Sequence, residues 1–167
     1  MTVILFIVIS QLTFYMGACN CKQCYKLHKL NQATNDVSLF TFSGIKCYGK
    51  VVDVYDGDTF KICFYYRNKL TKINCRAVGY DSYELKPRRN IKDRATHIEK
   101  AKKAKQYLID LLNAKNNLVY VNCHEFDKYG RVLVTIYENI FSKKSINTMM
   151  IEKGHGVLYD GGTKTLV

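Results

Sequence analysis

Five charged side chains fall at the ends of predicted strands, in a pattern that suits the hydrolysis of a phosphodiester. That reaction needs an activated water, stabilisation of the charge that builds on the phosphoryl oxygens, and usually a metal ion. Carboxylates are ligands that hard cations such as Ca²⁺ and Mg²⁺ prefer, and planar guanidinium groups suit bidentate contact with phosphate. The residues that supply these groups are Asp58, Asp81, Glu84, Arg76 and Arg131.

Short strands must carry these side chains. Residues 51–55, 59–65 and 70–78 are rich in β-formers and are separated by turn signals, so they predict a meander of three strands. The first turn is 56–58, which places Asp58 at the start of the second strand. The second is a polar hairpin loop at 67–69. Arg76 lies late in the third strand, and Asp81 and Glu84 follow it directly.

A long helix is expected after the break at Pro87–Asn90, with Thr96-x-x-Glu99 as a capping box. Its apolar face is predicted from five positions at helical spacing: Ile98, Ala101, Lys105, Leu108 and Leu112. Two further strands, at 118–123 and 132–137, flank the turn 127–130, and Arg131 opens the second of them. A last helix is expected over 145–153, ending at Gly154.

Five short strands with a helix between the third and the fourth match the OB-fold barrel, an α+β architecture. We therefore expect an OB-fold five-stranded β-barrel with that long helix, and a second helix after the fifth strand. The domain is expected to span residues 45–167. Residues 1–44 are expected to form an apolar N-terminal segment followed by a polar, cysteine-containing linker.

Three separated motifs resemble those of the staphylococcal nuclease (thermonuclease) family. They are Asp56-Gly57-Asp58-Thr59, the spacing Arg76-x4-Asp81-x2-Glu84, and Asp127-Lys128-Tyr129-Gly130-Arg131. Each motif alone is an ordinary turn or surface charge, and it is their joint occurrence in order that carries the resemblance, over about residues 45–159. The resemblance implies a Ca²⁺-dependent endonuclease that acts on both DNA and RNA.

Carried over position by position, the resemblance implies that Asp58 and Asp81 hold one Ca²⁺ ion, with the backbone carbonyl of Ser82 as a further ligand. Other divalent metals remain open. Glu84 would be the general base, or the residue that orients the attacking water.

The resemblance also assigns the cationic groups. Arg76 and Arg131 would clamp the phosphate and stabilise the transition state, and Lys128 and Tyr129 resemble contacts to a terminal phosphate. One departure is Tyr83, which stands where the family often has proline before the glutamate.

The rival function is a non-catalytic module of the same family that binds nucleic acid or protein. Such modules typically lose the acidic metal ligands or the arginines, and this chain keeps them, so catalysis is favoured. The 26 lysines and arginines against 14 acidic residues give a formal net charge of +12, which attracts polyanions. We expect a monomer with DNA and RNA as substrates.

The N-terminal segment allows several interpretations. Residues 1–21 carry no charged side chain and contain the apolar run 3–9, which predicts a secretory signal or a membrane anchor. If translation starts at Met16, acylation at Gly17 and Cys19 would instead anchor the protein to the cytoplasmic face of a membrane. A small zinc site, ranked last, would use Cys19, Cys21, Cys24 and His28.

The seven cysteines are an odd number, which argues against a fully paired disulfide framework. Cys63, Cys75 and Cys123 lie inside apolar predicted strands. We expect these three to be small buried hydrophobic residues.

Overall fold

The computed structural model describes residues 22–89 and 93–159 of the 167-residue chain. The chain divides into two compact units, Met1–Phe40 and Thr41–Val167. The described part of the first unit contains one helix, α2 (Lys22–Asn31), none of whose residues is buried. Across both described ranges, every helix is too short or too polar to cross a membrane. The zinc ligands and acylation sites proposed at residues 17–21 lie outside the described residues.

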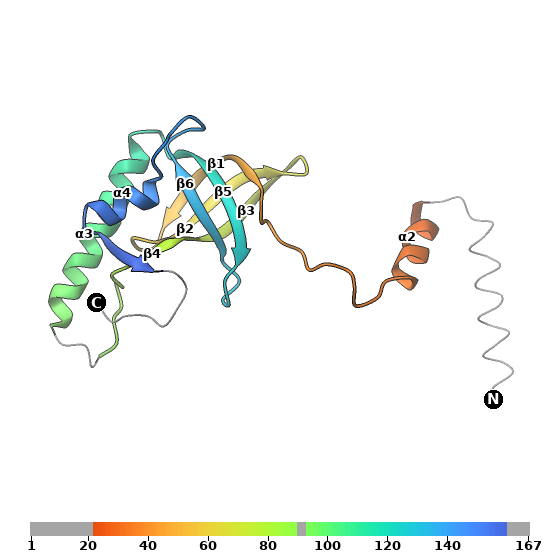
Figure 1. Ribbon diagram of the computed structural model, residues 1–167, viewed down its shortest axis with the longest axis horizontal. Coiled ribbons are helices and arrows are strands. Elements are labelled where there is room, and N and C mark those ends of the chain that lie inside the picture. The colour runs from red at the N-terminus through yellow and green to blue at the C-terminus, as the bar shows by residue number, and fades with distance from the viewer. Residues whose placement is uncertain (1–21, 90–92, 160–167) are drawn as a thin grey trace, which may run out of the picture. The chain divides into compact units, whose positions relative to one another are not determined.

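The second unit is a small barrel with two helices and a short extra sheet (Figure 1). Its elements in chain order are β1 (Lys46–Val54), β2 (Thr59–Tyr66), β3 (Lys69–Ala77), β4 (Gly79–Ser82), α3 (Arg94–Asn113), β5 (Leu118–Phe126), β6 (Val132–Tyr137), α4 (Ile146–Glu152) and β7 (Gly156–Tyr159).

The barrel closes in the order β1-β2-β3-β6-β5. Neighbouring strands of the barrel pair antiparallel, except for β3 and β6. These two strands run parallel, with Arg76 opposite Leu133. The long helix α3 lies between the third and fourth barrel strands in the chain, and α4 follows the fifth, so the predicted OB-fold architecture is confirmed. Two short strands, β4 and β7, pair outside the barrel and were not predicted.

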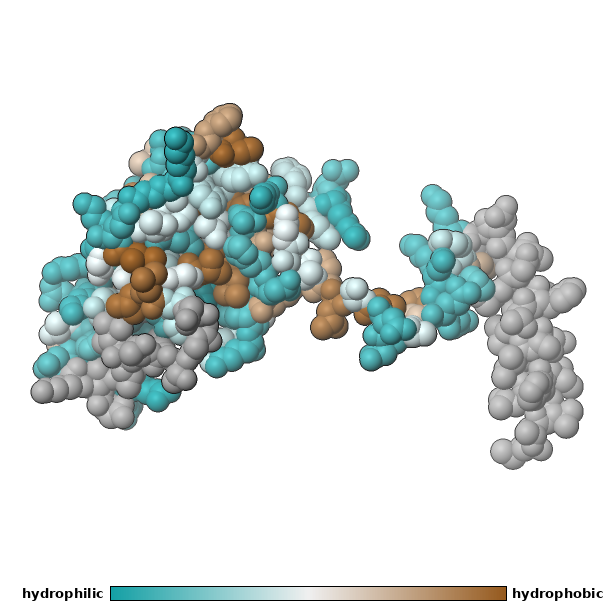
Figure 2. Space-filling view, in the orientation of Figure 1, coloured by the Kyte–Doolittle hydropathy of each residue, from teal (hydrophilic) through white to brown (hydrophobic). Residues whose placement is uncertain are grey.

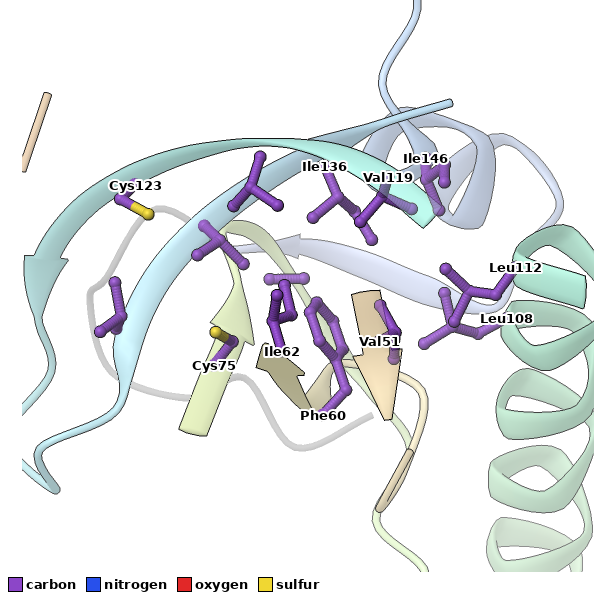
Figure 3. Close-up of a cluster of buried hydrophobic side chains, with 14 of the residues drawn as sticks. Val51, Phe60, Ile62, Cys75, Leu108, Leu112, Val119, Cys123, Ile136 and Ile146 are labelled. Carbon is purple, nitrogen blue, oxygen red and sulfur yellow. The ribbon is translucent and has the colours of Figure 1, made fainter. Parts of the chain in front are cut away.

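Alternation along the strands explains the core. In β6, Val132, Val134 and Ile136 are buried, and the residues between them are half-buried. Figure 3 shows side chains from β1, β2, β5 and β6 meeting inside the barrel, with Leu108 and Leu112 of α3 closing one end. Outside this core the surface is largely hydrophilic, with apolar side chains gathered in a few places (Figure 2).

The turn between β2 and β3 is tighter than predicted. Only Arg67 and Asn68 form it, both in the left-handed region with φ of 48° and 62°. Two such residues give a turn whose twist matches that of the strands. Lys69 therefore belongs to β3, not to the loop.

The capping box proposed at the start of the long helix is wrong. The helix α3 begins at Arg94, and Asp93 before it has a φ of 54° and makes no side-chain capping bond. Thr96 and Glu99 are consequently inside the helix, where Glu99 pairs with Lys103 at 2.7 Å. Charged residues one turn apart stabilise a helix in this way.

Two of the three cysteines expected to be buried are indeed in the core, namely Cys75 and Cys123. The prediction fails for Cys63, which is half-buried because it alternates with the inward-facing Ile62 and Phe64. Phe42 packs edge-to-face against Phe64 and Tyr66, which adds residues before Ile45 to the core.

Candidate active site

The turn between β1 and β2 is fixed by its own aspartate. Oδ1 of Asp56 accepts the N–H groups of Asp58 at 3.2 Å and Thr59 at 2.8 Å. A side-chain oxygen bonded to the backbone two and three residues ahead closes such a turn. The turn presents Asp58 and Thr59 at the start of β2.

Gly57 lets this turn approach the rest of the site closely. A Cβ atom there would lie 2.1 Å from Oγ of Ser82 and 3.0 Å from Cβ of Ala104, so a larger residue would displace the turn. The hydroxyl of the buried Tyr80 donates to the Gly57 carbonyl at 2.7 Å. Burial, and after it the negative charge of Asp58, raise the pKa of Tyr80 well above its ordinary value, so it stays a neutral donor.

Two buried carboxylates share one guanidinium. Asp58 and Asp81 are 4% and 7% exposed, and Arg76 lies between them. Its Nη1 donates to Oδ1 of Asp58 at 3.3 Å, and its Nη2 donates to Oδ1 of Asp81. The barrel register produces this contact, because Thr59 at the start of β2 stands opposite Arg76 on β3.

The site carries a surplus of negative charge. Burial, followed by the charge of Asp58, raises the pKa of the half-buried Asp56 to about 6. Asp56 therefore adds a carboxylate beside Asp58, and Arg76 is the guanidinium that contacts Asp58 and Asp81. Such a site favours the entry of a further cation.

Ser82 lies directly beside Asp58. Its N–H donates to Oδ2 of Asp58 at 2.9 Å, and its hydroxyl donates to the carbonyl of His155 at 3.1 Å. Glu84 follows two residues later on the exposed stretch after β4. Glu84 is itself exposed, and it stands three residues after the buried Asp81.

A self-organised hairpin positions Arg131. Oδ1 of Asp127 accepts the N–H groups of Tyr129 at 2.8 Å and Arg131 at 2.9 Å. Oδ2 of Asp127 accepts Nε of Arg131 at 2.7 Å. Although burial alone would raise the pKa of Asp127, these hydrogen bonds together hold it below its ordinary value. Arg131 itself lies immediately before β6, not within it.

Thr59 joins the two halves of the site. Its hydroxyl donates to Oδ1 of Asp58 at 2.9 Å and accepts from Nη1 of Arg131 at 3.1 Å. A continuous network therefore runs from Arg131 through Thr59 and Asp58 to Arg76 and Asp81. In the described residues, the hydrogen bonds of Arg131 use Nε and Nη1, which leaves Nη2 for a ligand.

Aromatic rings flank both arginines. Cζ of Arg131 and Nζ of Lys128 lie 5.5 and 5.2 Å from the ring centre of Tyr129, which is 72% exposed. Cζ of Arg76 lies 6.0 Å from the ring centre of Tyr159 at the end of β7. Cations near aromatic rings are attracted to them, and an exposed ring offers a stacking surface.

The donor set fits a hard divalent cation. Within the described ranges, no group of three or more His, Cys, Asp and Glu side chains is arranged to hold a metal ion. The oxygens that are together are the carboxylates of Asp58 and Asp81, with the Ser82 backbone beside Asp58. Carboxylate oxygens such as these suit Ca²⁺ or Mg²⁺, whose remaining ligands are commonly carbonyls, waters and substrate oxygens.

Sequence reasoning missed three supporting residues. Asp56 and Asp127 each order a turn, and Thr59 links the arginines. Asp56 directly precedes Gly57, and Asp127 stands three residues before Gly130. Aspartate is common at such turn positions, so the sequence did carry a signal for these two turns. The role of Thr59 depends on the β2–β3 register and on how far Arg131 reaches, which no local signal contains.

A comparison with known protein families identifies the kind of domain. Comparison with curated proteins gave no match. The sequence model of a family described as staphylococcal nuclease homologue matches residues 75–165, more than half of the chain. The match includes Arg76, Asp81, Glu84 and Arg131, and Asp58 lies upstream of it. A domain of this kind indicates a nuclease or a nucleic-acid-binding module. The chain belongs to the staphylococcal nuclease homologue family.

Proposed function

We propose that the protein is a metal-dependent endonuclease that hydrolyses phosphodiester bonds of DNA and RNA, with Ca²⁺ as its metal. The observation that carries the proposal is the single network in which two buried carboxylates share Arg76 and connect through Thr59 to Arg131. Burying charged side chains costs free energy of folding unless they are fully paired, so a buried charged network is often kept for a function. A cation and a phosphate would bind to the two ends of this network.

Asp58, Asp81 and the carbonyl of Ser82 would hold the ion. When bound, the metal would polarise a phosphoryl oxygen and offset its developing charge. The two side chains suit this role because they are already buried and converge on one cationic group, Arg76. Because these side chains are already ordered, little of their conformational entropy is lost when the ion binds.

Glu84 would accept a proton from the attacking water at its carboxylate. Two observations support this role: its side chain is exposed to water, and it follows Ser82 by two residues. The alternative role is to orient that water without taking its proton.

Arg76 and Arg131 would bind the nonbridging phosphoryl oxygens and stabilise the charge of the transition state. Arg131 is held by Asp127 and Thr59 at two of its nitrogens, so Nη2 is aimed without further ordering. Donors fixed in advance are worth more than mobile ones, because they need no reorganisation during the reaction. Lys128 and Tyr129 would contact a terminal phosphate and a neighbouring base.

The cleavage assay on the full chain tests this proposal. We expect single-stranded DNA and RNA to be cut in the presence of Ca²⁺ and to survive in EDTA. Glu84→Gln should lose most of kcat while it keeps its affinity for substrate, and Glu138→Gln, a change at another acidic residue of the domain, is the matched control. A pure protein that cuts nothing with any divalent metal would contradict the proposal.

The second candidate is a family module that binds nucleic acid without cutting it. The net charge of +12 supports binding in either case. Tight binding together with an absence of cleavage at every metal would establish this candidate.

We also propose that residues 1–44 deliver the domain to a membrane or out of the cell, leaving residues 45–167 as the catalytic domain. Support comes from the uncharged residues 1–21 and from the basic helix α2, which follows them. Secretion, an intact anchor, and acylation at Gly17 and Cys19 after a start at Met16 give different N-terminal masses. Mass spectrometry of the expressed protein distinguishes the three.

A further inference from the structure

A row of tyrosines crosses the outer face of the barrel on β1, β5 and β6. Tyr48 stands opposite Tyr120, and Tyr120 stands opposite Tyr137. Directly opposed residues on neighbouring strands point to the same face. The rings of Tyr48 and Tyr120 meet edge-to-face with centroids 5.4 Å apart, and Tyr48 remains 54% exposed.

A polar row lies beside the tyrosines on the same face. This row is displaced by two residues along each strand from the tyrosines. In it, Lys46 stands opposite Asn122, and Asn122 stands opposite Thr135. Side chains two residues apart on a strand share a face. The two rows therefore place aromatic rings next to a lysine and an amide.

The loop after β6 forms a wall over this face. Asn139 organises the loop, because its Oδ1 accepts the N–H of Phe141 at 2.9 Å and its N–H donates to Ser142 Oγ at 3.2 Å. The loop presents Ile140 and Phe141, which are 52% and 89% exposed. Figure 2 shows apolar side chains gathered at the top of the molecule, where Figure 1 places this loop.

The loop after β6 and the outer face of the strands form the sides of an open groove of about 240 Å³. Its lining residues are Lys46, Tyr120, Asn122, Tyr137, Ile140, Ser142 and Lys143. Small-molecule pockets usually measure roughly 300–1,000 Å³, so this groove suits one flat group of a larger ligand. The residues that line it carry two positive charges and no negative one.

We propose that this groove, the tyrosine groove, is a second binding site for single-stranded nucleic acid. Bases would stack on the tyrosines, and Lys46 and Lys143 would contact the backbone phosphates. Aromatic rings in a positively charged groove are the usual means of binding single strands without sequence preference. The choice of ligand class rests on the proposed function, whereas the groove itself does not.

The tyrosine groove would hold a part of the substrate away from the cleaved bond. The groove is lined by Lys46, the first residue of β1, and by Tyr137, the last residue of β6. The turn of Asp58 follows the other end of β1, and Arg131 precedes the other end of β6. A short substrate at the carboxylates would not span this separation, and a long strand would. The groove would therefore favour long single strands over short ones.

Binding measured in EDTA separates this proposal from catalysis. The full chain is titrated with a fluorescent DNA strand of about 30 nucleotides, longer than the roughly 4–16 that one OB fold covers. We expect Tyr120→Ala to weaken binding about tenfold, since stacking is worth about 1–3 kcal/mol per base. Tyr120→Phe should bind like the wild type, and cleavage of a short substrate should not change.

Two further variants guard against loss of folding and against a general surface effect. Lys46→Glu combined with Lys143→Glu changes exposed side chains only and should weaken binding of the long strand and flatten its salt dependence. Tyr65→Ala removes a strand tyrosine that is 74% exposed outside the groove and should bind normally.

Equal binding by the wild type, Tyr120→Ala and the double lysine variant would overturn the proposal, even if the protein cleaves DNA. Equal losses in Tyr120→Ala and Tyr65→Ala would overturn it as well. If the wild type bound no single strand in EDTA, the proposal would be overturned, and a protein would be the remaining class of partner for the groove. Selective loss at the groove would support the proposal even in a protein without nuclease activity.

Discussion

Thr59 is the side chain through which the two arginines of the site are connected. A hydroxyl can donate and accept at once, and Thr59 does both, to Asp58 and from Arg131. The bond to Asp58 also fixes which carboxylate oxygen faces Arg76. Both arginines are thus oriented by one group that would not itself touch the substrate.

Replacing Thr59 by valine tests this connection, because valine keeps the shape and removes the hydroxyl. We expect kcat to fall about tenfold, as the loss of a hydrogen bond to a charged group costs about 1.5–3 kcal/mol, while KM changes little. Thr59→Ser keeps the hydroxyl and should retain most of the activity. Steady-state kinetics of both variants decide the matter, and equal rates for valine and serine would assign Thr59 a packing role only.

Asp127 links the pH dependence of stability to the arginine that it holds. The pKa of Asp127 is lowered in the folded protein, so its ionised form stabilises the fold. That stabilisation is fully present above the ordinary aspartate pKa of about 3.9 and is lost as the pH falls through the lower folded value. We expect Asp127→Asn to unfold more readily than the wild type at pH 7, and the difference to vanish towards pH 2. Urea midpoints measured across that range check it, and a difference independent of pH would contradict the assignment.

At the scale of elements, the stretch between β4 and α3 carries Glu84, the proposed general base. The helix holds this stretch at two places. Tyr83 contacts the His97 ring with centroids 5.8 Å apart and lies under Nζ of Lys100 at 5.0 Å. Further along, Nε of Arg94 donates to the Pro87 carbonyl at 3.5 Å. Tyr83 is thus held against α3 through His97 and Lys100.

We therefore expect Tyr83→Ala to lower kcat several-fold by loosening Glu84, with little loss of global stability. Tyr83→Phe keeps the ring, hence the contacts with His97 and Lys100, and should remain close to wild type. Kinetics combined with limited proteolysis after β4 would measure both effects. If Tyr83→Ala were cut by protease no faster than the wild type, the loop would be held by something else.

Elements with a strong pattern could be predicted from the sequence, and those made by distant pairing could not. The five barrel strands alternate over six or more residues, and α3 repeats at helical spacing, so both leave a local signature. Strands β4 and β7 have four residues each and pair Gly79 with Tyr159 across most of the domain. Four residues carry too little alternation to predict such a pair. The carboxylates and arginines were predictable because three motifs mark them, whereas the tyrosine groove exists only in the register of three strands.

At the scale of the whole molecule, a single buried amide helps to close the barrel. Nδ2 of Asn147 donates to the carbonyls of Val78 at 2.9 Å and Val134 at 3.1 Å, and its Oδ1 accepts the N–H of Ile136 at 3.0 Å. The side chain belongs to α4, so it ties that helix to β6 and to the chain leaving β3. The residues joined in this way include both sides of the parallel β3–β6 pair.

Asn147→Leu should therefore weaken the whole domain, because leucine fits the volume and satisfies none of these backbone groups. A buried polar group left without a partner costs about 1–3 kcal/mol. The Val78 carbonyl and the Ile136 N–H lose the partner described here, whereas the Val134 carbonyl still accepts the Val78 N–H at 3.0 Å. We expect the free energy of unfolding to drop on the order of 3 kcal/mol or more. Asn74→Leu, at an exposed position on β3, is the matched control and should change it little. Urea unfolding of the two variants makes the comparison. Because the chain leaving β3 leads to Asp81, a proposed metal ligand, the buried variant should also bind Ca²⁺ more weakly than the wild type at temperatures where it is still folded. Unchanged Ca²⁺ affinity would show that the proposed metal site does not depend on barrel closure.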